Sequence, residues 1–367
     1  MRLSLPDLFK GLLLVFALGF LSLSGLSCAS RSVGQQNSSP TGESIQAAID
    51  ALGSSGGIVQ LPCTVVYLKQ TITIEAPIVL QGCGTSVGDV SGENPGTRLI
   101  WVGGTGIAID VGPTSHDLKA RGAVLRDFNL ENQGGGSIGI RINTQEPRMI
   151  NVFVLSLGDR VGDPNPGIPF TTAGVVVGDI ATGMVNDFLC RDCYLRFQED
   201  GIQLLNVSEA TLDHSRILEN RRYNILLGDA THVCNNIQIV NGTAFASSRI
   251  TKGAGIKITR AANIVNVENS YCENDQGTLC IDATDIVGSD LNQLNIRDNY
   301  FAKGFSVADY SVGLNSPTVN VVLAGNVFLG DAKAGVLNLK AQAILSEANL
   351  LLGGTPELFS SLANVKQ

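Results

Sequence analysis

The 367-residue sequence has few aromatic residues, few charged residues and only three histidines. Aromatic side chains make up 5% of the chain and charged side chains 16%. Cysteines and histidines do not have the spacing of a zinc site, because the pair Cys190 and Cys193 has no second pair. Amphipathic helical periodicity does not follow the strand-like segments, which excludes helices as the cover of a sheet. Any sheet in this protein must therefore be covered by other strands.

The sequence instead repeats a phrase of glycine, an apolar residue, any residue and a second apolar residue. Copies begin at Gly106, Gly139, Gly174, Gly201 and Gly255, with variants at Asn224, Thr278, Ser311 and Gly335. From one first apolar residue to the next, the steps are 33, 35, 27, 23, 31, 23, 33 and 24 residues. Each copy alternates as a strand does, and a second strand signal lies inside each period. Two or three short strands per period predict the coils of a parallel β-helix.

A second pattern in the later repeats concerns asparagine. Asn269, Asn299 and Asn326 each precede an aromatic residue by two positions. The three aromatic residues are Tyr271, Phe301 and Phe328. We interpret the asparagines as a hydrogen-bonded ladder at a turn and the aromatic rings as a stack inside the rod. Both ladders indicate fold and carry no function.

The N-terminus predicts export. Arg2 and Lys10 precede or flank an apolar run that ends in small residues, so residues 1–29 are interpreted as a signal peptide. A signal anchor is the alternative, but sixteen apolar residues are short for a membrane span. Cys28 is also a candidate for the lipidated residue of a bacterial lipoprotein. We expect a secreted, extracellular or cell-envelope protein, with residues 30–43 as a flexible linker.

Export permits disulfide bonds, and the chain has eight cysteines. The pairs closest in sequence are Cys63 with Cys83, Cys190 with Cys193, and Cys272 with Cys280. Spacing alone does not establish the connectivity. If Cys28 is removed or lipidated, at least one of the other seven stays unpaired.

Residues 44–84 carry a specific resemblance. A helix is expected over residues 44–52, and strand signals follow near residues 56–62, 72–74 and 78–84. This order resembles the opening of pectate-lyase-superfamily β-helices, in which a short helix plugs the open end. The aspartate-phenylalanine-glycine phrase that commonly precedes it in that superfamily is absent here.

The resemblance implies one all-β domain, a right-handed parallel β-helix with a short N-terminal capping helix. Its cap and first strands would occupy residues 44–84, its coils residues 85–354, and its C-terminal cap or tail residues 355–367. Thr355, Pro356 and Glu357 have the pattern of a helix start. The superfamily includes polysaccharide lyases, glycoside hydrolases, epimerases, tailspikes and non-catalytic adhesins, so function depends on side chains.

Large polar residues crowd the positions just before one pair of repeats. The 23-residue step stacks Glu199 against Arg222, Asp200 against Tyr223, and Gln198 against Arg221. Lys252 and Lys257 follow on the next coil. Residues 216–260 hold seven lysines and arginines against two acids, in a chain of net charge −8.

A basic strip in an acidic, exported protein favours an acidic polysaccharide as partner. Few aromatic residues accompany the strip, which argues against nucleic acid. The alternative is that the cations pair with acids on neighbouring coils and bind nothing. Those acids are Asp187, Asp192, Glu199, Asp200 and Asp213.

Hydrolysis of a glycosidic bond is the first candidate reaction. Residues 199–202 resemble the paired-aspartate motif of polygalacturonases, and residues 255–259 resemble a later motif of that family. The resemblance implies Glu199 and Asp200 as acid and base, and Lys257 as a ligand of the substrate carboxylate. Three family residues are replaced, an aspartate by Ala173, a histidine by Tyr223 and a lysine by Thr259.

β-Elimination from a uronate is the second candidate reaction, and it needs a base and a cation. Arg222, Lys252 and Lys257 are candidate bases. His214 is a further acid or base candidate, and Tyr223, Lys257, Arg221 and His214 are expected to contact substrate. The candidate cofactor is Ca²⁺, with Glu199, Asp200 and Asp213 as oxygen ligands. The competing interpretation is a non-catalytic glycan-binding or cell-surface protein that uses the same groove.

Overall fold

The computed structural model describes most of the chain. The described residues are 30–32, 40–85, 96–113, 118–156, 168–180, 183–245, 253–274, 279–286, 291–303, 309–315, 320–331, 333–339, 343–360 and 365–366. The predicted signal peptide, Cys28 and Lys252 lie outside these ranges. In the described part, no helix is both long and apolar enough to cross a membrane.

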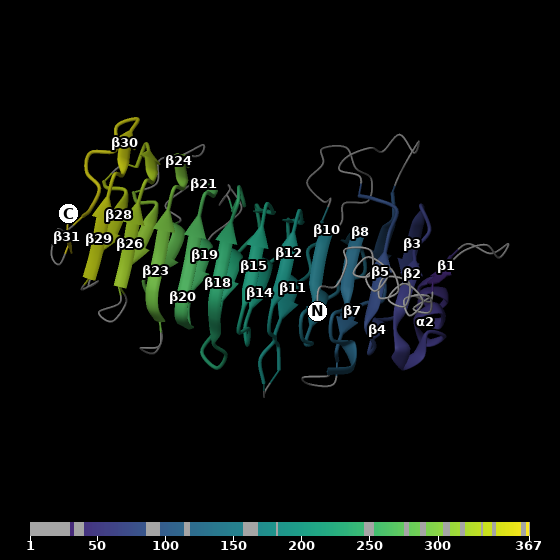
Figure 1. Cartoon of the computed structure of the whole chain (residues 1–367). Coiled ribbons are helices and arrows are strands. Elements are labelled where there is room, and N and C mark those ends of the chain that lie inside the picture. Colours follow the sequence, from purple (N-terminus) through teal and green to yellow (C-terminus); the bar gives the residue numbers. More distant parts are fainter. Residues whose placement is uncertain are drawn as a thin grey trace, which may run out of the picture.

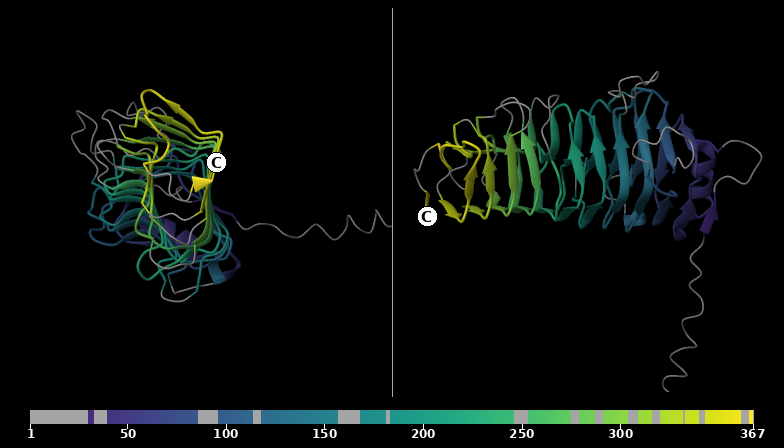
Figure 2. Two further views of the ribbon diagram at one scale, coloured as in Figure 1. Left: turned by 90° about the vertical axis from the view of Figure 1, so that its left-hand side faces the viewer. Right: turned by 90° about the horizontal axis from the view of Figure 1, so that it is seen from above.

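Parallel strands wind into a rod whose sheets run along its length (Figures 1 and 2). The protein is a right-handed parallel β-helix with a short N-terminal helix, as predicted. Three sheets form its walls, and we name them the repeat sheet, the long sheet and the third sheet.

The repeat sheet has ten strands and contains the repeated phrases. Its strands are β4 (Ile72–Ile74), β7 (Ile107–Val111), β9 (Ile138–Ile142), β11 (Ala173–Val177), β14 (Asp200–Leu204), β17 (Tyr223–Leu227), β19 (Ala254–Ile258), β22 (Leu279–Ala283), β25 (Val312–Leu314) and β28 (Val336–Asn338).

The long sheet has seventeen strands and the third sheet four. The long sheet contains β1 (Ser30–Ser32), β2 (Gly57–Gln60), β3 (Val65–Leu68), β5 (Ile78–Gln81), β6 (Arg98–Trp101), β8 (Val124–Asn132), β10 (Arg148–Leu155), β12 (Phe188–Arg191), β13 (Tyr194–Arg196), β15 (Ala210–Asp213), β16 (Arg216–Leu218), β18 (Cys234–Val240), β20 (Ala261–Glu268), β23 (Leu291–Arg297), β26 (Asn320–Ala324), β29 (Ala343–Glu347) and β31 (Val365–Lys366). The third sheet contains β21 (Tyr271–Asn274), β24 (Tyr300–Lys303), β27 (Val327–Leu329) and β30 (Leu350–Leu352).

The interior is a continuous apolar core that runs through the coils. Ile202, Ile225 and Ile256 pair on successive strands of the repeat sheet, and all three side chains are fully buried. Each coil therefore covers the apolar side chains of the next, which explains why no layer of helices is needed.

The observed registers confirm the predicted steps of 35, 27, 23, 31 and 24 residues. The other three steps were each wrong by two residues. Ile109, not Ile107, pairs with Ile140. Ile281, not Leu279, pairs with Ile256 on one side and Val312 on the other. A slip of two residues leaves the same side chains facing inward, so the apolar pattern does not detect it.

The polar ladder at one turn contains Asn299, Asn326 and Asn349. The backbone N–H of Asn299 donates to Asn326 Oδ1 at 3.1 Å, and that of Asn326 donates to Asn349 Oδ1 at 3.1 Å. Asn269 was wrongly assigned to this ladder, because Ser270 occupies the equivalent position. Asn269 is exposed and adopts a positive φ of 48° at the turn itself.

The aromatic ladder also departs from the prediction, by one residue, in the coil that contains Tyr271. Phe301 and Phe328 stack inside the rod with ring centroids 5.1 Å apart, as predicted. Tyr271 pairs with Tyr300 instead of Phe301, and the two tyrosine rings stack on the outside at 5.8 Å. A one-residue slip reverses the face of a strand residue, which is why Tyr271 points outward.

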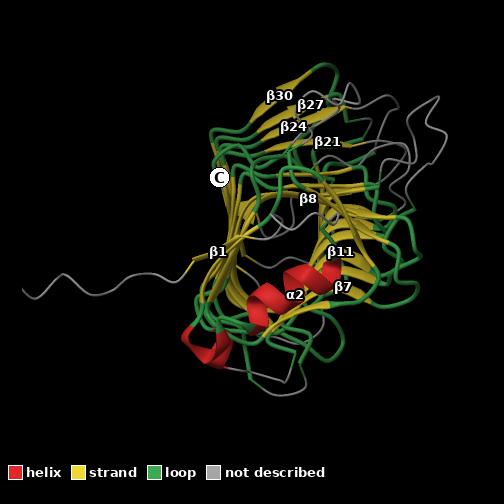
Figure 3. Ribbon diagram, turned by 90° about the vertical axis from the view of Figure 1, so that its right-hand side faces the viewer, coloured by secondary structure: helices red, strands yellow, loops and turns green. Residues whose placement is uncertain are grey.

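The N-terminal end is closed by helix α2 (Gly42–Asp50), with the short 3₁₀ helix η1 (Gly53–Ser55) after it and η2 (Leu118–Ala120) further along. Thr41 and Ser44 form a reciprocal capping box, so the helix begins two residues before the predicted range. Helix α2 lies across the end of the rod (Figure 3) and buries Ile45 and Ile49. Ser30–Ser32, predicted as linker, form β1 and pair with β2.

The C-terminal end closes without a helix. Residues 355–360 are irregular, and Phe359 is buried and bridged to Val336 on the last coil. Thr355 accepts backbone hydrogen bonds from Gly330 and Asp331 at 3.0 Å through Oγ1. The helix start predicted at Thr355 is therefore wrong, because the Thr355 hydroxyl accepts hydrogen bonds between coils and does not cap a helix.

Two of the three cysteine pairs suggested by spacing are disulfides. Cys63 is bonded to Cys83, and Cys272 to Cys280. Cys190 and Cys193 are buried thiols, as is Cys234. Burial raises the pKa of the Cys190 thiol well above its usual value and that of Cys234 to about 12.

Candidate functional site

Side chains on the outer face of the repeat-sheet strands form one row, which follows the third position of most repeated phrases and lies two residues beyond it in the phrases at Gly106 and Thr278. In order along the rod the row contains Asp110, Arg141, Val176, Gln203, Leu226, Lys257, Asp282, Gly313 and Leu337. Oppositely charged residues are direct neighbours at two places in this row. Cross-strand pairs of this kind stabilise a sheet face and hold each other's orientation.

One compact group of side chains lies beside this row, and we call it the Arg222 cluster. It consists of Asp200, Gln203, Arg222 and Tyr223. Asp200 begins strand β14 and pairs with Tyr223, which begins β17. Backbone hydrogen bonds of 2.8 Å from Arg222 to Glu199 and from Arg221 to Gln198 confirm the predicted stacking.

Glycine at position 201 is required by the packing of this corner. A Cβ atom there would lie 2.5 Å from the Ile217 side chain and 2.6 Å from Nδ2 of Asn220. Such distances are far below ordinary contact, so the backbone of β14 approaches the core closely at this point. Asp200, which precedes Gly201, lies directly beside the Arg222 side chain.

The carboxylate of Asp200 is fully buried and accepts four hydrogen bonds. Arg222 donates from Nε at 2.9 Å and from Nη2 at 2.5 Å, one to each carboxylate oxygen. Gln203 Nε2 donates at 2.7 Å and the Tyr223 backbone N–H at 3.2 Å. The side chain of Asp200 is 0% exposed, so substrate does not reach it. Asp200 anchors Arg222, and its burial argues against its predicted role as acid or base.

Arg222 is the exposed partner of this pair. Its side chain is 47% exposed, and its guanidinium carbon lies 5.2 Å from the centre of the Tyr223 ring. The hydrogen bonds to Asp200 raise the pKa of Arg222 above its usual value. Arg222 therefore stays protonated, which argues against its predicted role as the base of an elimination.

Glu199 and Arg221 flank the Arg222 cluster. Glu199 is half-buried, and its charge is among the causes that raise the pKa of Arg222. Arg221 is exposed. Among the described residues, neither Glu199 nor Arg221 has a side-chain ion pair.

Lys257 is buried and already paired. Its Nζ lies 2.8 Å from Asp282 Oδ2 and 3.0 Å from Asp285 Oδ2, and the residue is 7% exposed. Burial alone would lower the pKa of Lys257, but the hydrogen bonds and charges of Asp282 and Asp285 outweigh it and the pKa is raised. Lys257 pairs with two carboxylates of its own chain, which argues against its predicted roles as base and as ligand of a substrate carboxylate.

His214 lies at a different corner of the coil, between strands β15 and β16. Its Nδ1 is 2.6 Å from Asp192 Oδ1, and its φ of 47° forms the turn. The structure does not bring it to the Arg222 cluster. Lys252 lies outside the described residues.

The three carboxylates proposed to bind calcium are separated. Asp213 ends β15 and accepts hydrogen bonds from Arg191 at 3.0 Å and from Asn241 at 3.0 Å. Both oxygens of Asp200 are occupied by the Arg222 cluster. Over the described ranges, no three acidic, cysteine or histidine side chains are arranged to hold a metal ion.

We expected the lysines and arginines of residues 216–260 to pair with acids on neighbouring coils. Arg222 and Asp200 form such a pair. Asp187, Asp192 and Asp213 instead contact Arg148, His214 and Arg191. Sequence reasoning missed the pair of Asp110 and Arg141, in which Nε and Nη2 of Arg141 donate at 3.0 Å and 2.6 Å. Arg141 occupies the third position of its phrase, but Asp110 lies two residues beyond that position, so the pair follows from the observed register and not from the repeated phrase.

Comparison with solved structures shows where this fold occurs. The A-module of mannuronan C-5 epimerase AlgE4 from Azotobacter vinelandii matches with TM-score 0.57 and 15% identity, over 88% of this chain and 94% of the module. The surface adhesin PfbA of Streptococcus pneumoniae matches with TM-score 0.58 and 13% identity, over 92% and 93%. The tailspike gp49 of the Acinetobacter baumannii bacteriophage Fri1, a capsular polysaccharide depolymerase, matches with TM-score 0.52 and 12% identity, over 93% of this chain and 61% of the tailspike.

No protein-family model matches the sequence, and no curated protein sequence matches it. At identities of 12–15% the three structures share the fold with this chain and show nothing about its activity. The resemblance to pectate-lyase-superfamily β-helices is thus confirmed at the level of the fold.

Proposed function

We propose that this protein is an exported β-helix protein that binds an acidic polysaccharide on the outer face of the repeat sheet, around Arg222. One observation carries the proposal. A fully buried carboxylate, Asp200, holds one edge of the Arg222 guanidinium while about half of that side chain faces solvent. Guanidinium groups bind carboxylates by paired hydrogen bonds, and an oriented side chain loses little entropy on binding.

The surroundings of Arg222 extend the proposed surface. Arg221 adds a second exposed cation, Tyr223 a half-buried ring, and Glu199 an acceptor for sugar hydroxyls. In the outward row the neighbours of Gln203 are Val176 and Leu226, and all three residues are buried, so the polar groups of the proposed surface are those around Arg222. The structurally similar epimerase and depolymerase act on polysaccharides, and the adhesin is a surface protein, which supports an extracellular, polysaccharide-directed role.

Binding is favoured over cleavage by the state of the predicted catalytic groups. Asp200 is out of reach of a substrate, and Arg222 and Lys257 are held protonated by their carboxylate partners. Cleavage is the second candidate, and Glu199 favours it. Its carboxylate lies near Arg222 and has no ion-pair partner in the described part of the chain, so Glu199 is the candidate acid or base of this surface.

The test measures binding of the purified protein to polygalacturonate, alginate and neutral dextran by biolayer interferometry. Arg221→Gln and Arg222→Lys are each expected to weaken binding of the acidic polymers by about tenfold, the effect of one charge-assisted hydrogen bond. Arg191→Gln is the matched control, because Arg191 is an exposed arginine on the long sheet and pairs with Asp213. It should bind as the unchanged protein does.

Two outcomes would contradict the proposal. Either no acidic polymer binds, or Arg191→Gln loses as much affinity as Arg221→Gln, which would indicate nonspecific charge attraction. The same samples are assayed for new reducing ends and for the ultraviolet absorbance of unsaturated uronate. Product that disappears in Glu199→Gln would establish the second candidate function in place of simple binding.

A further inference from the structure

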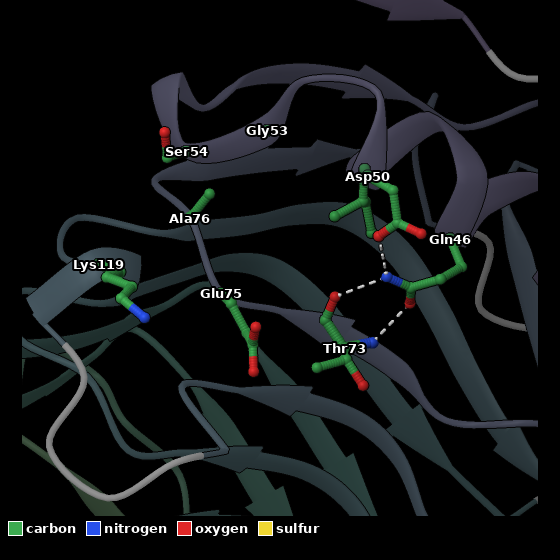
Figure 4. A pocket seen from close by; sticks show the side chains of 9 residues that line it. Gln46, Asp50, Gly53, Ser54, Thr73, Glu75, Ala76 and Lys119 are labelled. Atoms are coloured by element: carbon green, nitrogen blue, oxygen red, sulfur yellow. Dashed lines mark hydrogen bonds between the residues drawn. The ribbon is translucent and has the colours of Figure 1, made fainter.

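A cleft lies at the N-terminal end of the rod, between the capping helix and the first coil. Its volume is about 410 Å³, within the range of small-molecule sites. Its walls come from α2, η1, the end of β4 and η2 (Figure 4). We call it the cap cleft, and it belongs to a part of the molecule that the Arg222 cluster does not include.

One wall of the cap cleft is held rigidly by Gln46. Strand β4 is the end strand of the repeat sheet and pairs only with β7. Gln46 Oε1 accepts from the Thr73 backbone N–H at 2.8 Å, and Gln46 Nε2 donates to the Thr73 carbonyl at 3.1 Å. The side chain therefore occupies the open edge as a neighbouring strand would, and it fixes α2 against β4.

The same amide orients Asp50. Gln46 Nε2 also donates to Asp50 Oδ1 at 2.8 Å, which leaves the second carboxylate oxygen of Asp50 free of that bond. Figure 4 shows the Glu75 carboxylate between Lys119 and Thr73, on the opposite side of the cleft from Ser54. Hydrogen-bond acceptors thus surround the opening.

Ile49 and Ala76 contribute apolar atoms to the lining of the cleft, and the two residues are 4% and 7% exposed. Asp50 and Glu75 against Lys119 give a net charge of −1, which disfavours anions, while the polar rim disfavours a purely apolar ligand. A ligand with one apolar face and several hydroxyl donors fits both features.

From this arrangement we infer that the cap cleft is a second binding site, for a small saccharide of one or two sugar rings. The apolar face of a sugar ring packs on Ile49 and Ala76, and vicinal hydroxyls donate to the carboxylates of Asp50 and Glu75. Lys119 donates to a ring or hydroxyl oxygen. The site is separate from the proposed polyanion surface, and its two carboxylates disfavour acidic sugars.

The experiment titrates the intact protein with glucose, galactose, N-acetylglucosamine, cellobiose and lactose, followed by saturation-transfer NMR. At least one of these sugars is expected to bind. Ser54→Trp places a large side chain on the rim of the cleft and should abolish the signal. Ser55→Trp is the matched control, because Ser55 is the adjacent exposed residue and does not line the cleft. Glu75→Gln should weaken binding by about tenfold through loss of a charged acceptor.

Arg221→Gln separates the two proposals, because it alters only the surface around Arg222. Sugar binding that survives Arg221→Gln and is lost in Ser54→Trp supports the cap cleft, whatever the result with acidic polymers. Binding of none of the five sugars, or binding that survives Ser54→Trp, overturns the inference. Circular dichroism melting of each variant distinguishes loss of binding from loss of fold.

Discussion

Removing the Arg222 guanidinium tests the central contact of the candidate site. Arg222→Met takes two hydrogen bonds and the positive charge away from Asp200, whose side chain is completely buried. Breaking a buried ion pair in this way costs about 3–5 kcal/mol, because the remaining charge is neither solvated nor neutralised. Gln203 and the Tyr223 backbone N–H still donate to Asp200, so we expect the lower end, about 3 kcal/mol.

Urea unfolding followed by far-ultraviolet circular dichroism measures this loss. With an m value of about 3 kcal/mol per molar, a 3 kcal/mol loss lowers the midpoint by about 1 M. The double variant Asp200→Asn with Arg222→Met removes the buried charge as well, and it should be more stable than Arg222→Met alone. The control is Arg191→Met, which breaks the more exposed pair with Asp213 and should cost no more than about 1 kcal/mol.

Two results would refute the reasoning. A midpoint for Arg222→Met equal to that of Arg191→Met would mean that the pair with Asp200 is not buried in solution. A double variant less stable than Arg222→Met would mean that the charge of Asp200 is satisfied without the arginine.

Three further expectations follow from the same kind of contact. Lys257→Met leaves the carboxylate of Asp282 without its cation, and we expect the free energy of unfolding, measured in urea, to fall by about 3 kcal/mol. Burial would raise the pKa of Asp229, but hydrogen bonds from His232 and neighbouring backbone outweigh it and lower the pKa to about 2. The folded pKa lies below the ordinary value of 3.8, so the carboxylate stabilises the fold above that value and this stability is lost as pH falls towards 2. Asp229→Asn should therefore flatten the pH dependence of the unfolding midpoint in this window, and an unchanged slope would contradict the assignment. The buried Cys234 thiol, with its pKa near 12, should resist iodoacetamide at neutral pH and react only after unfolding, as read by mass spectrometry.

The sequence predicted the stacking at the candidate site because the register of these two coils follows the repeated phrase. Ile202 and Ile225 are separated by 23 residues and pair as predicted. Glu199 against Arg222 and Asp200 against Tyr223 followed directly from that spacing. At two other places the pattern gave Ile107 and Leu279 the positions of Ile109 and Ile281, because a two-residue slip keeps every side chain on its face.

Side-chain roles were less predictable than side-chain positions. Asp200 and Lys257 were found at the expected places but hold partners on neighbouring strands. Whether a carboxylate faces solvent or an arginine depends on the depth of its strand and on the close approach of Gly201 to the core. Neither property is expressed in the spacing of the repeats.

Chain periodicity alone determined the parallel β-helix and the inward face of each repeat strand, because apolar residues at period two must be buried and no layer of helices follows the strands to bury them. The tertiary structure decided the register of the remaining coils and the depth of each side chain, and therefore which charges neutralise each other. Opposite charges a few ångströms apart interact strongly only when burial excludes water, and burial is a property of the assembled rod. Contacts that form only when successive coils stack therefore fix the orientation of the Arg222 side chain and bury the charge of Lys257.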